Sequence, residues 1–526
     1  MLSPRLLYIT GAILMALGGC DSSAPISPPE TQENEQDMPP EVIGDTASDT
    51  ELPVPPACPP LPPTMDSHRV TAQGTEFVDS LGRTVLFRGI NGGGRAKFPP
   101  FLPFDFAESN STTFEGALPF DEAVEVYANR IQNWGHNVVR MPFTWEALEP
   151  ERDAFDETWL GRYETLVNAM TSRGIYVIVD FHQDVYNRAF CGDGFPFWTL
   201  EDPTLDIPPM EECKDWFLGY ILPGPSKDAF DRFWNNEDNL HQEFQDMWIH
   251  MINRFKDNER VLGFELMNEP GTGNVDEATF VSTTLSQFYN EQIGVLRDVA
   301  EPATLFFDST GIEGVSSTTS LIRPDGDGLS FAPHYYDPAA LLSGGEFEAA
   351  ESYSEPIGKW REKGDEWDMP VLLGEFGAKH MLESAGEFID KAFDALDDHL
   401  LHGTAWEYSE SALDWNMEGL SMYTPDHGEY PTALATIRAY PSAVAGVLTS
   451  FQFEGDDRTG SLEFSPWKDG VTAIKVPARL YPEGVEFTVL SGNVCFQHHE
   501  DSESLLIRAL GDQSVHVEFG PQGALE

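Results

Sequence analysis

The sequence predicts an α/β protein that consists of a (β/α)8 barrel followed by an antiparallel β-sandwich domain. Eight short apolar segments alternate for the most part with helical patterns, which favours a barrel over an open doubly wound sheet. Two of these segments end in glutamate, Glu269 and Glu375. After Tyr440 the helical patterns stop, and short alternating runs punctuated by Gly and Pro take their place.

The candidate strands of the barrel are apolar runs that end at polar or aromatic residues. They lie at residues 85–91, 137–142, 175–181, 261–267, 304–307, a segment ending at His334, 369–377 and 404–408. The candidate helices between them lie at residues 121–134, 159–173, 239–255, 280–299 and 382–400. A short hairpin at residues 77–83 precedes the first strand. Gly92-Gly93-Gly94 follows that strand but lacks the spacing of a dinucleotide-binding fingerprint.

These patterns divide the chain into four parts. Residues 1–20 are a predicted signal peptide with a lipobox, residues 21–66 a Pro-rich acidic disordered linker, residues 67–442 the barrel domain, and residues 443–526 the β-sandwich domain. The sandwich is predicted from alternating runs such as residues 472–476 and 485–489. A length of 526 residues exceeds what one hydrophobic core normally supports, which agrees with two folded domains.

The chain is strongly acidic, with 31 Lys and Arg against 88 Asp and Glu and a net charge of −57. Such a field repels phosphate backbones, so we expect no nucleic-acid partner. The acidity favours solubility and is also compatible with a saline medium. A hydrophobic content of 41% is sufficient for a folded core, so the acidity does not indicate global disorder.

The N-terminus has the features of an export signal. Arg5 precedes an apolar stretch at residues 6–17, which is too short to span a bilayer comfortably. The stretch closes with a Leu-Gly-Gly-Cys sequence that ends at Cys20 and resembles a bacterial lipobox. The resemblance implies lipidation of Cys20, and the alternative is an ordinary cleaved signal peptide. In both cases we expect an exported protein, either a membrane-anchored lipoprotein of a bacterial cell envelope or a secreted one.

The linker at residues 21–66 contains no Lys or Arg and twelve prolines. Its apolar side chains are too sparse to form a core, so we expect an extended tether. Four cysteines follow Cys20, and export permits them to form disulfides. Cys191 and Cys213 lie in one candidate loop and are the best candidate pair, although spacing alone does not fix the pairing. No set of residues has metal-ligand spacing, so we expect neither a metal nor a cofactor.

The chemistry is predicted to lie where the barrel strands end, because those ends converge on one pocket. The residues at these positions are Asn91, Arg140, His182, Asn268, Glu269, His334, Tyr336, Glu375 and Trp406. A single strand-end histidine or Asn-Glu-Pro sequence is usually structural. The whole set, uniformly polar or aromatic, indicates a catalytic site.

Two carboxyl groups on one pocket are what glycoside cleavage requires: one protonates the leaving oxygen, and the other acts as an ionised nucleophile or base. We expect Glu269 to be the acid/base, with Asn268 placed to bond the sugar 2-hydroxyl. We expect Glu375 to be the nucleophile, kept ionised and oriented by Arg140 and Tyr336. Trp406 would offer its ring to the C–H surface of a sugar.

These motifs resemble glycoside hydrolase family 5, which implies a retaining (β/α)8 enzyme with its acid/base on strand four and its nucleophile on strand seven. The residues that carry the resemblance are Val139-Arg140, Asn268-Glu269-Pro270, His334-Tyr335-Tyr336, Gly374-Glu375-Phe376-Gly377 and Trp406. Within the family, four longer stretches resemble the endoglycoceramidases, and the resemblance spans roughly residues 70 to 525. These stretches are Asp180-Phe181-His182-Gln183-Asp184, residues 192–198, residues 264–271 and Ala332-Pro333-His334-Tyr335-Tyr336-Asp337.

The resemblance implies a glycosphingolipid substrate, cleaved between its glycan and its ceramide. It also implies contacts to the sugar beside the scissile bond from Lys97, Asp184, Asn268, Tyr336 and Trp406. We expect Arg140, His182 and His334 to bind the substrate as well, and the enzyme to be a monomer. A related family 5 glucosylceramidase, steryl-glucosidase or endoglucanase is the alternative within the same class of enzyme. An inactive, membrane-tethered glycolipid-binding module is the alternative of another class.

Two loops on the predicted active face are rich in aromatic residues. The segment at residues 190–234 is too long for a simple connection and carries ten aromatic side chains, and four phenylalanines occur at residues 98–106. If exposed, these side chains would form an apolar surface for ceramide and for a membrane. They would otherwise form a small core of their own beneath the loops, and the two arrangements can coexist.

Overall fold

The computed structural model describes residues 58, 59, 61, 68–109, 117–341 and 351–525 of the chain. Within these residues, eight parallel strands form one sheet in the order β8-β7-β6-β5-β4-β3-β10-β9. The strands are β3 (Arg88–Asn91), β4 (Val138–Phe143), β5 (Tyr176–Phe181), β6 (Val261–Glu265), β7 (Thr304–Phe307), β8 (Leu329–Phe331), β9 (Leu372–Leu373) and β10 (His402–Ala405). Parallel bridges from β8 and the residues after it to the β9 segment close the sheet, at Phe331 with Val371 and at His334 with Glu375. The predicted (β/α)8 barrel is therefore confirmed.

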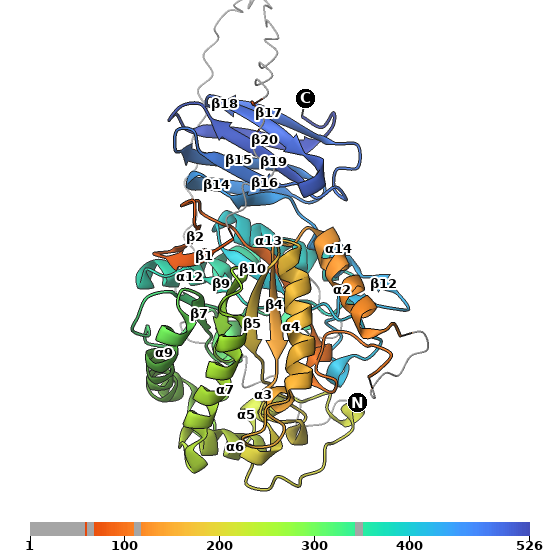
Figure 1. Ribbon diagram of the computed structural model, residues 1–526, viewed down its shortest axis with the longest axis vertical. Coiled ribbons are helices and arrows are strands. Elements are labelled where there is room, and N and C mark those ends of the chain that lie inside the picture. The colour runs from red at the N-terminus through yellow and green to blue at the C-terminus, as the bar shows by residue number, and fades with distance from the viewer. Residues whose placement is uncertain (1–57, 60, 62–67, 110–116, 342–350, 526) are drawn as a thin grey trace, which may run out of the picture. The chain divides into compact units, whose positions relative to one another are not determined.

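Helices surround the barrel strands, as Figure 1 shows for β4, β5 and β10. They are α2 (Phe120–Trp134), α4 (Glu157–Ser172), α7 (Leu240–Phe255), α9 (Ser286–Ala300), α12 (Glu351–Trp367) and α13 (Ala385–Asp398). Their apolar faces bury side chains such as Ile131, Leu166 and Trp248 against the strands. None of the helices in the described part of the chain is both long and apolar enough to cross a lipid bilayer.

A hairpin of β1 (Val70–Gln73) and β2 (Glu76–Asp79) covers the amino end of the barrel. The Phe77 ring lies 5.3 Å from that of Phe87 and 5.9 Å from that of Phe306. The predicted turn at residues 77–83 is also present, because Val78 pairs with Thr84 and Asp79 N donates to Arg83 O at 3.0 Å. The β1–β2 hairpin precedes it and turns at Gly74, which adopts a φ of 57° that favours glycine.

The C-terminal domain consists of two four-stranded antiparallel sheets, as predicted for a β-sandwich. One sheet contains β13 (Tyr440–Ala443), β16 (Val471–Lys475), β18 (Val494–His499) and β19 (Ser504–Ala509), and the other β14 (Gly446–Glu454), β15 (Thr459–Pro466), β17 (Val485–Ser491) and β20 (Val515–Pro521). The domain contacts residues that precede barrel strands: Tyr440 Oη donates to Gly135 O at 2.9 Å, and Thr84 pairs with Val444. It therefore contacts the amino end of the barrel, away from the carboxyl ends of the strands.

The last residues of the predicted linker are attached to the C-terminal domain. Cys58 forms a disulfide with Cys495, and Leu61 is buried at 2% exposure against Val471 and Leu506. The prediction of a disordered linker is therefore wrong at residues 58, 59 and 61, because the disulfide of Cys58 and the burial of Leu61 hold this part of the chain in place. The remainder of residues 1–66, with the predicted signal peptide, Cys20 and the tether, lies outside the described residues.

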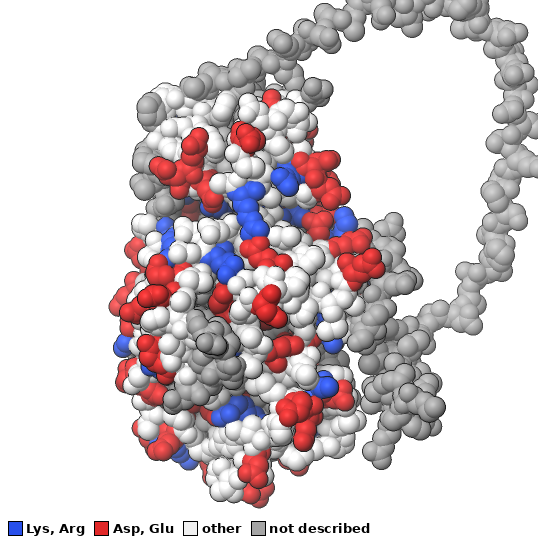
Figure 2. All heavy atoms as spheres, turned by 90° about the vertical axis from the view of Figure 1, so that its right-hand side faces the viewer, with Lys and Arg blue, Asp and Glu red and all other residues white. Residues whose placement is uncertain are grey.

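Acidic side chains are distributed over the folded part of the molecule. Figure 2 shows Asp and Glu spread over one face from the barrel to the C-terminal sheets, with smaller groups of Lys and Arg between them. The negative field is therefore not confined to the acidic segment that precedes the folded domains.

A glycine pair tests the packing of the barrel. A Cβ added at Gly89 in β3 would lie 2.1 Å from the backbone oxygen of Val138, whereas one added at Gly161 in α4 would meet no atom within 4 Å. We expect Gly89→Ala to lower the free energy of unfolding by about 1–3 kcal/mol or more, because β3 and β4 would have to separate. We expect Gly161→Ala to raise it by about 1 kcal/mol, because alanine favours the helix. Thermal unfolding measures both, and a neutral Gly89→Ala would contradict the strand spacing.

Candidate active site

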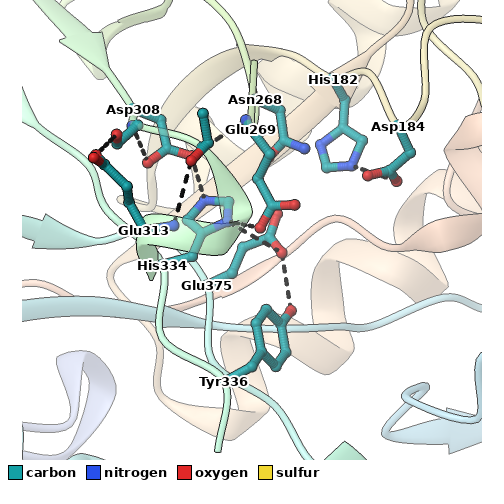
Figure 3. A network of polar contacts seen from close by, with 12 residues as sticks. His182, Asp184, Asn268, Glu269, Asp308, Glu313, His334, Tyr336 and Glu375 are labelled. Carbon is teal, nitrogen blue, oxygen red and sulfur yellow. Dashed lines mark hydrogen bonds and ion pairs between the residues drawn. The ribbon is translucent and has the colours of Figure 1, made fainter. Parts of the chain in front are cut away.

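The predicted strand-end residues lie together at the carboxyl end of the barrel. Figure 3 shows Asn268 and Glu269, which follow β6, beside His334 and Tyr336, which follow β8, and Glu375, which follows β9. His182 and Asp184, which follow β5, lie on the other side of Glu269 (Figure 3). Arg140, Lys97 and Trp406 join the same group through the contacts described below, so the structure brings together every predicted site residue of the barrel.

Arg140 is the hub of the group. Its guanidinium is fully buried and pairs with both oxygens of Glu265, each at 2.8 Å. It also donates to Asn268 Oδ1 at 2.8 Å and to Glu375 Oε1 at 2.7 Å. A buried guanidinium is tolerated only when its donors are satisfied, and here several acceptors surround it. The same contacts fix the orientations of Asn268 and Glu375.

Glu375 is held as a carboxylate. Besides the bond from Arg140, its Oε2 accepts a hydrogen bond from Tyr336 Oη at 2.9 Å. Burial alone would raise the pKa of Glu375, but the positive charges of His334 and Arg140 outweigh it and lower the pKa below its ordinary value. The backbone of Glu375 is fixed where the barrel closes, because Tyr335 N donates to Glu375 O at 2.9 Å. An ionised, oriented carboxylate of this kind can act as a nucleophile.

Glu269 lies opposite Glu375 and is the more accessible of the two, with 14% of its side chain exposed against 6%. Its Oε1 lies 2.8 Å from His334 Nδ1. One oxygen of Glu269, one oxygen of Glu375 and one ring nitrogen of His334 all lie within 4.8 Å of one another. Retaining glycosidases place their two carboxyl groups about 5 Å apart, whereas inverting enzymes need a wider gap for water. The spacing is therefore that of a retaining enzyme.

His334 connects the two glutamates to Asp308, which follows β7. The Nε2 atom of His334 lies 3.4 Å from Asp308 Oδ2. Burial alone would lower the pKa of His334, but Asp308, Glu375 and Glu269 outweigh it and raise the pKa to about 10. His334 therefore places a positive charge between three carboxyl groups at neutral pH.

A second group of charges lines the side of the site formed by the loops after β5 and β3. Lys97 Nζ donates to Asp184 Oδ2 at 2.6 Å, and His182 Nδ1 lies 2.8 Å from Asp180 Oδ2. Burial alone would raise the pKa of Asp184, but Lys97 and His182 lower it to about 2. Burial alone would lower the pKa of His182, but Asp180 and Asp184 raise it to about 10. These groups offer fixed donors and acceptors, which is the chemistry that sugar hydroxyls require.

Trp406 lies beneath this group. Its ring stacks on that of His182 with a centroid distance of 5.1 Å, and Lys97 Nζ lies 4.5 Å above it. Trp406 Nε1 donates to Glu418 Oε2 at 3.2 Å. Only 1% of Trp406 is exposed, so less of its ring is open to a sugar than the sequence predicts.

Four further residues belong to the site but were not predicted as site residues: Glu265, Asp308, Gln183 and Glu418. Glu265 is recognisable in the sequence as an acidic interruption of the apolar run at residues 261–267, a position that requires a buried cation. Asp308 directly follows the predicted strand at residues 304–307, so its strand-end position could have identified it. Gln183 and Glu418 lie in loops, where hydrophobic periodicity marks neither of them. Burial raises the pKa of Glu418 to about 8 despite the nearby charge of Lys97.

Two groups of side chains in the described part of the chain have the spacing of three metal ligands. They are His182, Asp184 and Asp193, and Glu269, His334 and Glu375. In each group the histidine has a pKa raised to about 10, so it is protonated at neutral pH and cannot donate a lone pair to a metal. Lys97 and Arg140 add further positive charge. The chemistry of both groups therefore disfavours a cation and favours hydrogen bonding to a neutral ligand.

Most of the aromatic side chains in the two loops are buried. Phe195, Phe230 and Phe233 are at most 1% exposed. Phe190, Phe197, Trp198, Tyr220 and Trp234 are partly buried against the main core. Most of them are therefore buried, as the second arrangement predicts, but they extend the main core and do not form a core of their own. Phe217, at 46% exposure, is an exception.

The Cys191–Cys213 disulfide fastens the segment that carries this exposed side chain. Within the segment, Trp216 and Tyr220 face the site: the Trp216 ring lies 5.7 Å from Lys97 Nζ, and Tyr220 Oη donates to Asp184 Oδ1 at 3.4 Å. Phe217 and Ile221 are exposed at 46% and 42%. Residues four apart share one face of a helix, so this turn presents one aromatic face to the site and one apolar face to solvent.

A parallel barrel whose strand ends hold two carboxyl groups at this spacing defines a retaining glycosidase. Residues 105–412 match the sequence profile of Cellulase (glycosyl hydrolase family 5), and residues 438–517 match that of the Glycoside hydrolase family 5 C-terminal domain. The chain belongs to glycosyl hydrolase family 5 and is a glycoside hydrolase.

Within this family the chain is similar to proteins that act on glycolipids. It is 26% identical to an endoglycoceramidase of Cyanea nozakii over 430 residues, which cover 75% of this chain and 80% of that protein. It is 30% identical to a glucosylceramidase of Aspergillus fumigatus over 249 residues, which cover 39% of this chain and 32% of that protein. A solved structure of endo-glycoceramidase II from Rhodococcus sp., in a five-membered iminocyclitol complex, superposes with a TM-score of 0.69 at 25% identity and covers 85% of this chain and 99% of that one.

The bond from Tyr336 to Glu375 has a measurable effect on the pH dependence. A donor that bonds the ionised form lowers the pKa of a carboxyl group, so Tyr336→Phe raises the pKa of Glu375. We expect the acid limb of the kcat/KM profile, which requires ionised Glu375, to move to higher pH, and kcat/KM at neutral pH to fall by about 10²-fold. Tyr335→Phe is the matched control, because the Tyr335 ring packs on Tyr353 instead. An acid limb that stays in place in Tyr336→Phe would rule out this role.

Proposed function

We propose that the protein hydrolyses the β-linkage between the glycan and the ceramide of glycosphingolipids and releases the intact glycan and ceramide. The observation that carries the proposal is the pair Glu269 and Glu375 at retaining spacing, in a chain similar over most of its length to endoglycoceramidases. A glucosylceramidase, steryl-glucosidase or endoglucanase activity of the same family is the second candidate. The similarity to a glucosylceramidase supports it but covers a smaller share of both chains.

In the proposed reaction, Glu375 attacks the anomeric carbon while Glu269 gives its proton to the departing ceramide oxygen. Glu269 then takes a proton from water, which displaces Glu375 and restores the enzyme. Arg140 and Tyr336 orient Glu375 for the attack. The charge of His334 stabilises Glu375 before the attack and after its release.

We assign the remaining predicted residues to the sugar next to the scissile bond. Lys97, Asp184 and His182 would bond its hydroxyls on one side, with the Trp406 ring beneath. Asn268 Oδ1 is already bonded to Arg140, so its amide group is the part available to the 2-hydroxyl. The assignments rest on the position of each group beside Glu269 and Glu375 (Figure 3).

The ceramide side of the site is assigned to apolar side chains on the adjoining loops. Phe217 and Ile221 lie on the turn whose other face contacts the site, together with Leu222, which is 45% exposed. Met417 is 52% exposed and precedes Glu418, the partner of Trp406. These side chains would contact ceramide and the surface of the bilayer that contains it.

We also propose that the protein is exported and that Cys20 is lipidated, which would anchor it in a bacterial cell envelope. The four cysteines after Cys20 form two disulfides, and disulfides persist in oxidising compartments outside the cytoplasm. This pairing leaves Cys20 as the one cysteine of the five without a disulfide partner in the chain. Monomeric behaviour remains the expectation.

Product analysis tests the proposed activity. We expect the wild type to release intact glycans from gangliosides and lactosylceramide, with slower or no cleavage of glucosylceramide and cellooligosaccharides, as measured by mass spectrometry of a mixed panel. Glu375→Gln should lower turnover by about 10⁴-fold or more while preserving the fold, because it lacks the nucleophile. A wild type that binds glycolipid but cleaves nothing would support the inactive module, and cleavage of glucosylceramide or of cellooligosaccharides alone would support the second candidate.

Azide provides the control for the role of Glu375. In Glu375→Gly the small anion can occupy the position of the missing carboxylate and attack the anomeric carbon directly. The product is then a glycosyl azide of inverted configuration. Lack of any rescue in a folded Glu375→Gly variant would argue against Glu375 as the nucleophile.

The apolar turn leads to a test with vesicles. In the double variant Phe217→Ser and Ile221→Ser, two half-exposed apolar side chains are lost to the lipid, so we expect kcat/KM on gangliosides in zwitterionic vesicles to fall by about tenfold or more. Activity on a soluble aryl lactoside should not change. Val447→Ser is the matched control, because Val447 is 63% exposed on the C-terminal domain. Equal loss on both substrates would place the turn in catalysis and not in contact with lipid.

A further inference from the structure

The backbone of Glu269 adopts an unfavourable conformation. Its φ is 35°, in the left-handed region that favours glycine. Pro270 follows, and a residue before proline strongly prefers an extended backbone. A strained residue of this kind persists only when its surroundings hold it in place.

Gln183 holds this turn from the loop after β5. Its Nε2 donates to Asn268 O and to Glu269 O, each at 2.8 Å. Asn268 Nδ2 donates back to Gln183 O at 3.1 Å. The side-chain amide of Gln183 therefore bonds the carbonyl groups of both Asn268 and the strained Glu269. Gln183 is itself fully buried.

Asp308 holds the same turn from the opposite side. Glu269 N donates to Asp308 Oδ2 at 3.2 Å. The same oxygen lies 3.4 Å from Nε2 of His334, whose Nδ1 lies 2.8 Å from Glu269 Oε1. Asp308 thus contacts the backbone of Glu269 directly and its carboxyl group through His334 (Figure 3).

The space beside the Glu269 carboxyl group is equally restricted. A Cβ on Gly311, at the start of α10 (Gly311–Ser316), would lie 2.6 Å from Glu269 Oε2. The carboxyl group therefore packs against the bare α-carbon of a glycine. The bonds to its backbone, the contact of its carboxyl group with His334 and the close packing against Gly311 together hold Glu269 in one position, beside Glu375.

We propose that Gln183 and Asp308 are positioning residues that fix Glu269 where it can protonate the leaving group. The inference deepens the proposed function and rests on its assignment of Glu269 as the acid/base. A displaced Glu269 impairs proton transfer, because such transfer requires hydrogen-bond distance. Neither Gln183 nor Asp308 has a hydrogen bond or ion pair to Glu375 among the interactions of the described residues, so the attack by Glu375 is affected far less. Asp308 reaches Glu375 only through His334, whose positive charge Glu375 and Glu269 also sustain.

Two substrates with different leaving groups separate these effects. Octyl β-lactoside releases an alkoxide, which needs a proton, whereas 2,4-dinitrophenyl β-lactoside releases a phenolate that departs as an anion. We expect Gln183→Ala and Asp308→Ala to lower kcat/KM for the octyl lactoside by about 10²-fold, the effect of a small misplacement of a catalytic group. The value of kcat/KM for the dinitrophenyl lactoside, which reports attack by Glu375, should stay nearly unchanged.

The second half of the reaction provides an independent readout. With the dinitrophenyl substrate the glycosyl-enzyme is then hydrolysed by water, a step that needs Glu269 as the base. We expect kcat and KM to fall together in both variants and azide, which needs no base, to restore kcat and yield a glycosyl azide of retained configuration. Asp308→Asn keeps an oxygen for Glu269 N, so it should lose less than Asp308→Ala.

Gln292→Ala is the matched control, because Gln292 is a fully buried glutamine on α9, outside the site. It should leave the ratio of the two kcat/KM values unchanged. Unchanged cleavage of the octyl lactoside in the Gln183 and Asp308 variants, or parallel loss on both substrates, would overturn the inference. Gln183→Met, which keeps the bulk but removes the donor, replaces Gln183→Ala should that variant fail to fold.

Glu269→Gln separates the inference from the proposed function. Selective loss on the octyl lactoside in Glu269→Gln, without such loss in the Gln183 and Asp308 variants, overturns the positioning roles alone. Equal effects of Glu269→Gln on both substrates overturn the acid/base assignment itself. A wild type that cleaves both lactosides but no glycosphingolipid overturns the proposed substrate and leaves the positioning roles intact.

Discussion

The active site depends on the buried guanidinium of Arg140. Because a buried positive charge requires acceptors, β6 must carry Glu265 inside the barrel, where an apolar residue would otherwise be preferred. The same cation bonds Glu375 and lowers the pKa of its carboxyl group. Its bond to Asn268 fixes the residue before the strained turn. The stability of this end of the barrel and the ionisation of Glu375 thus depend on the same buried guanidinium, and neither can change alone.

Much of the barrel could be predicted from the sequence because its strands are short apolar runs that end at polar residues. The predicted segment at residues 175–181 became β5 at Tyr176–Phe181, and the predicted segment at residues 304–307 became β7 with the same bounds. The helix α12 was not predicted. It contains Pro356, a residue that normally interrupts helices, and its residues are polar on average. Its own side chains Ile357 and Trp360 pack into the main core and stabilise it nonetheless.

The two glutamates and most of their partners were also predictable, because the carboxyl ends of parallel strands meet at one end of a barrel. Gln183 and Asp308 were not identified as partners of Glu269. Their roles depend on the path of two loops, and sequence periodicity carries no information about such paths. For the same reason the sequence left open which aromatic side chains are exposed. Trp216 and Phe217 are adjacent in the chain, yet one faces the site and the other solvent.

The disulfide between Cys58 and Cys495 has a mechanical consequence. Tension applied to the chain before Cys58 enters the folded domains through the sulfur–sulfur bond at β18. The β1–β2 hairpin at the amino end of the barrel and the barrel strands therefore carry no load. A pull on the segment before Cys58 is borne by the C-terminal sheets, and the alignment of the Glu269 and Glu375 carboxyl groups is insulated from it.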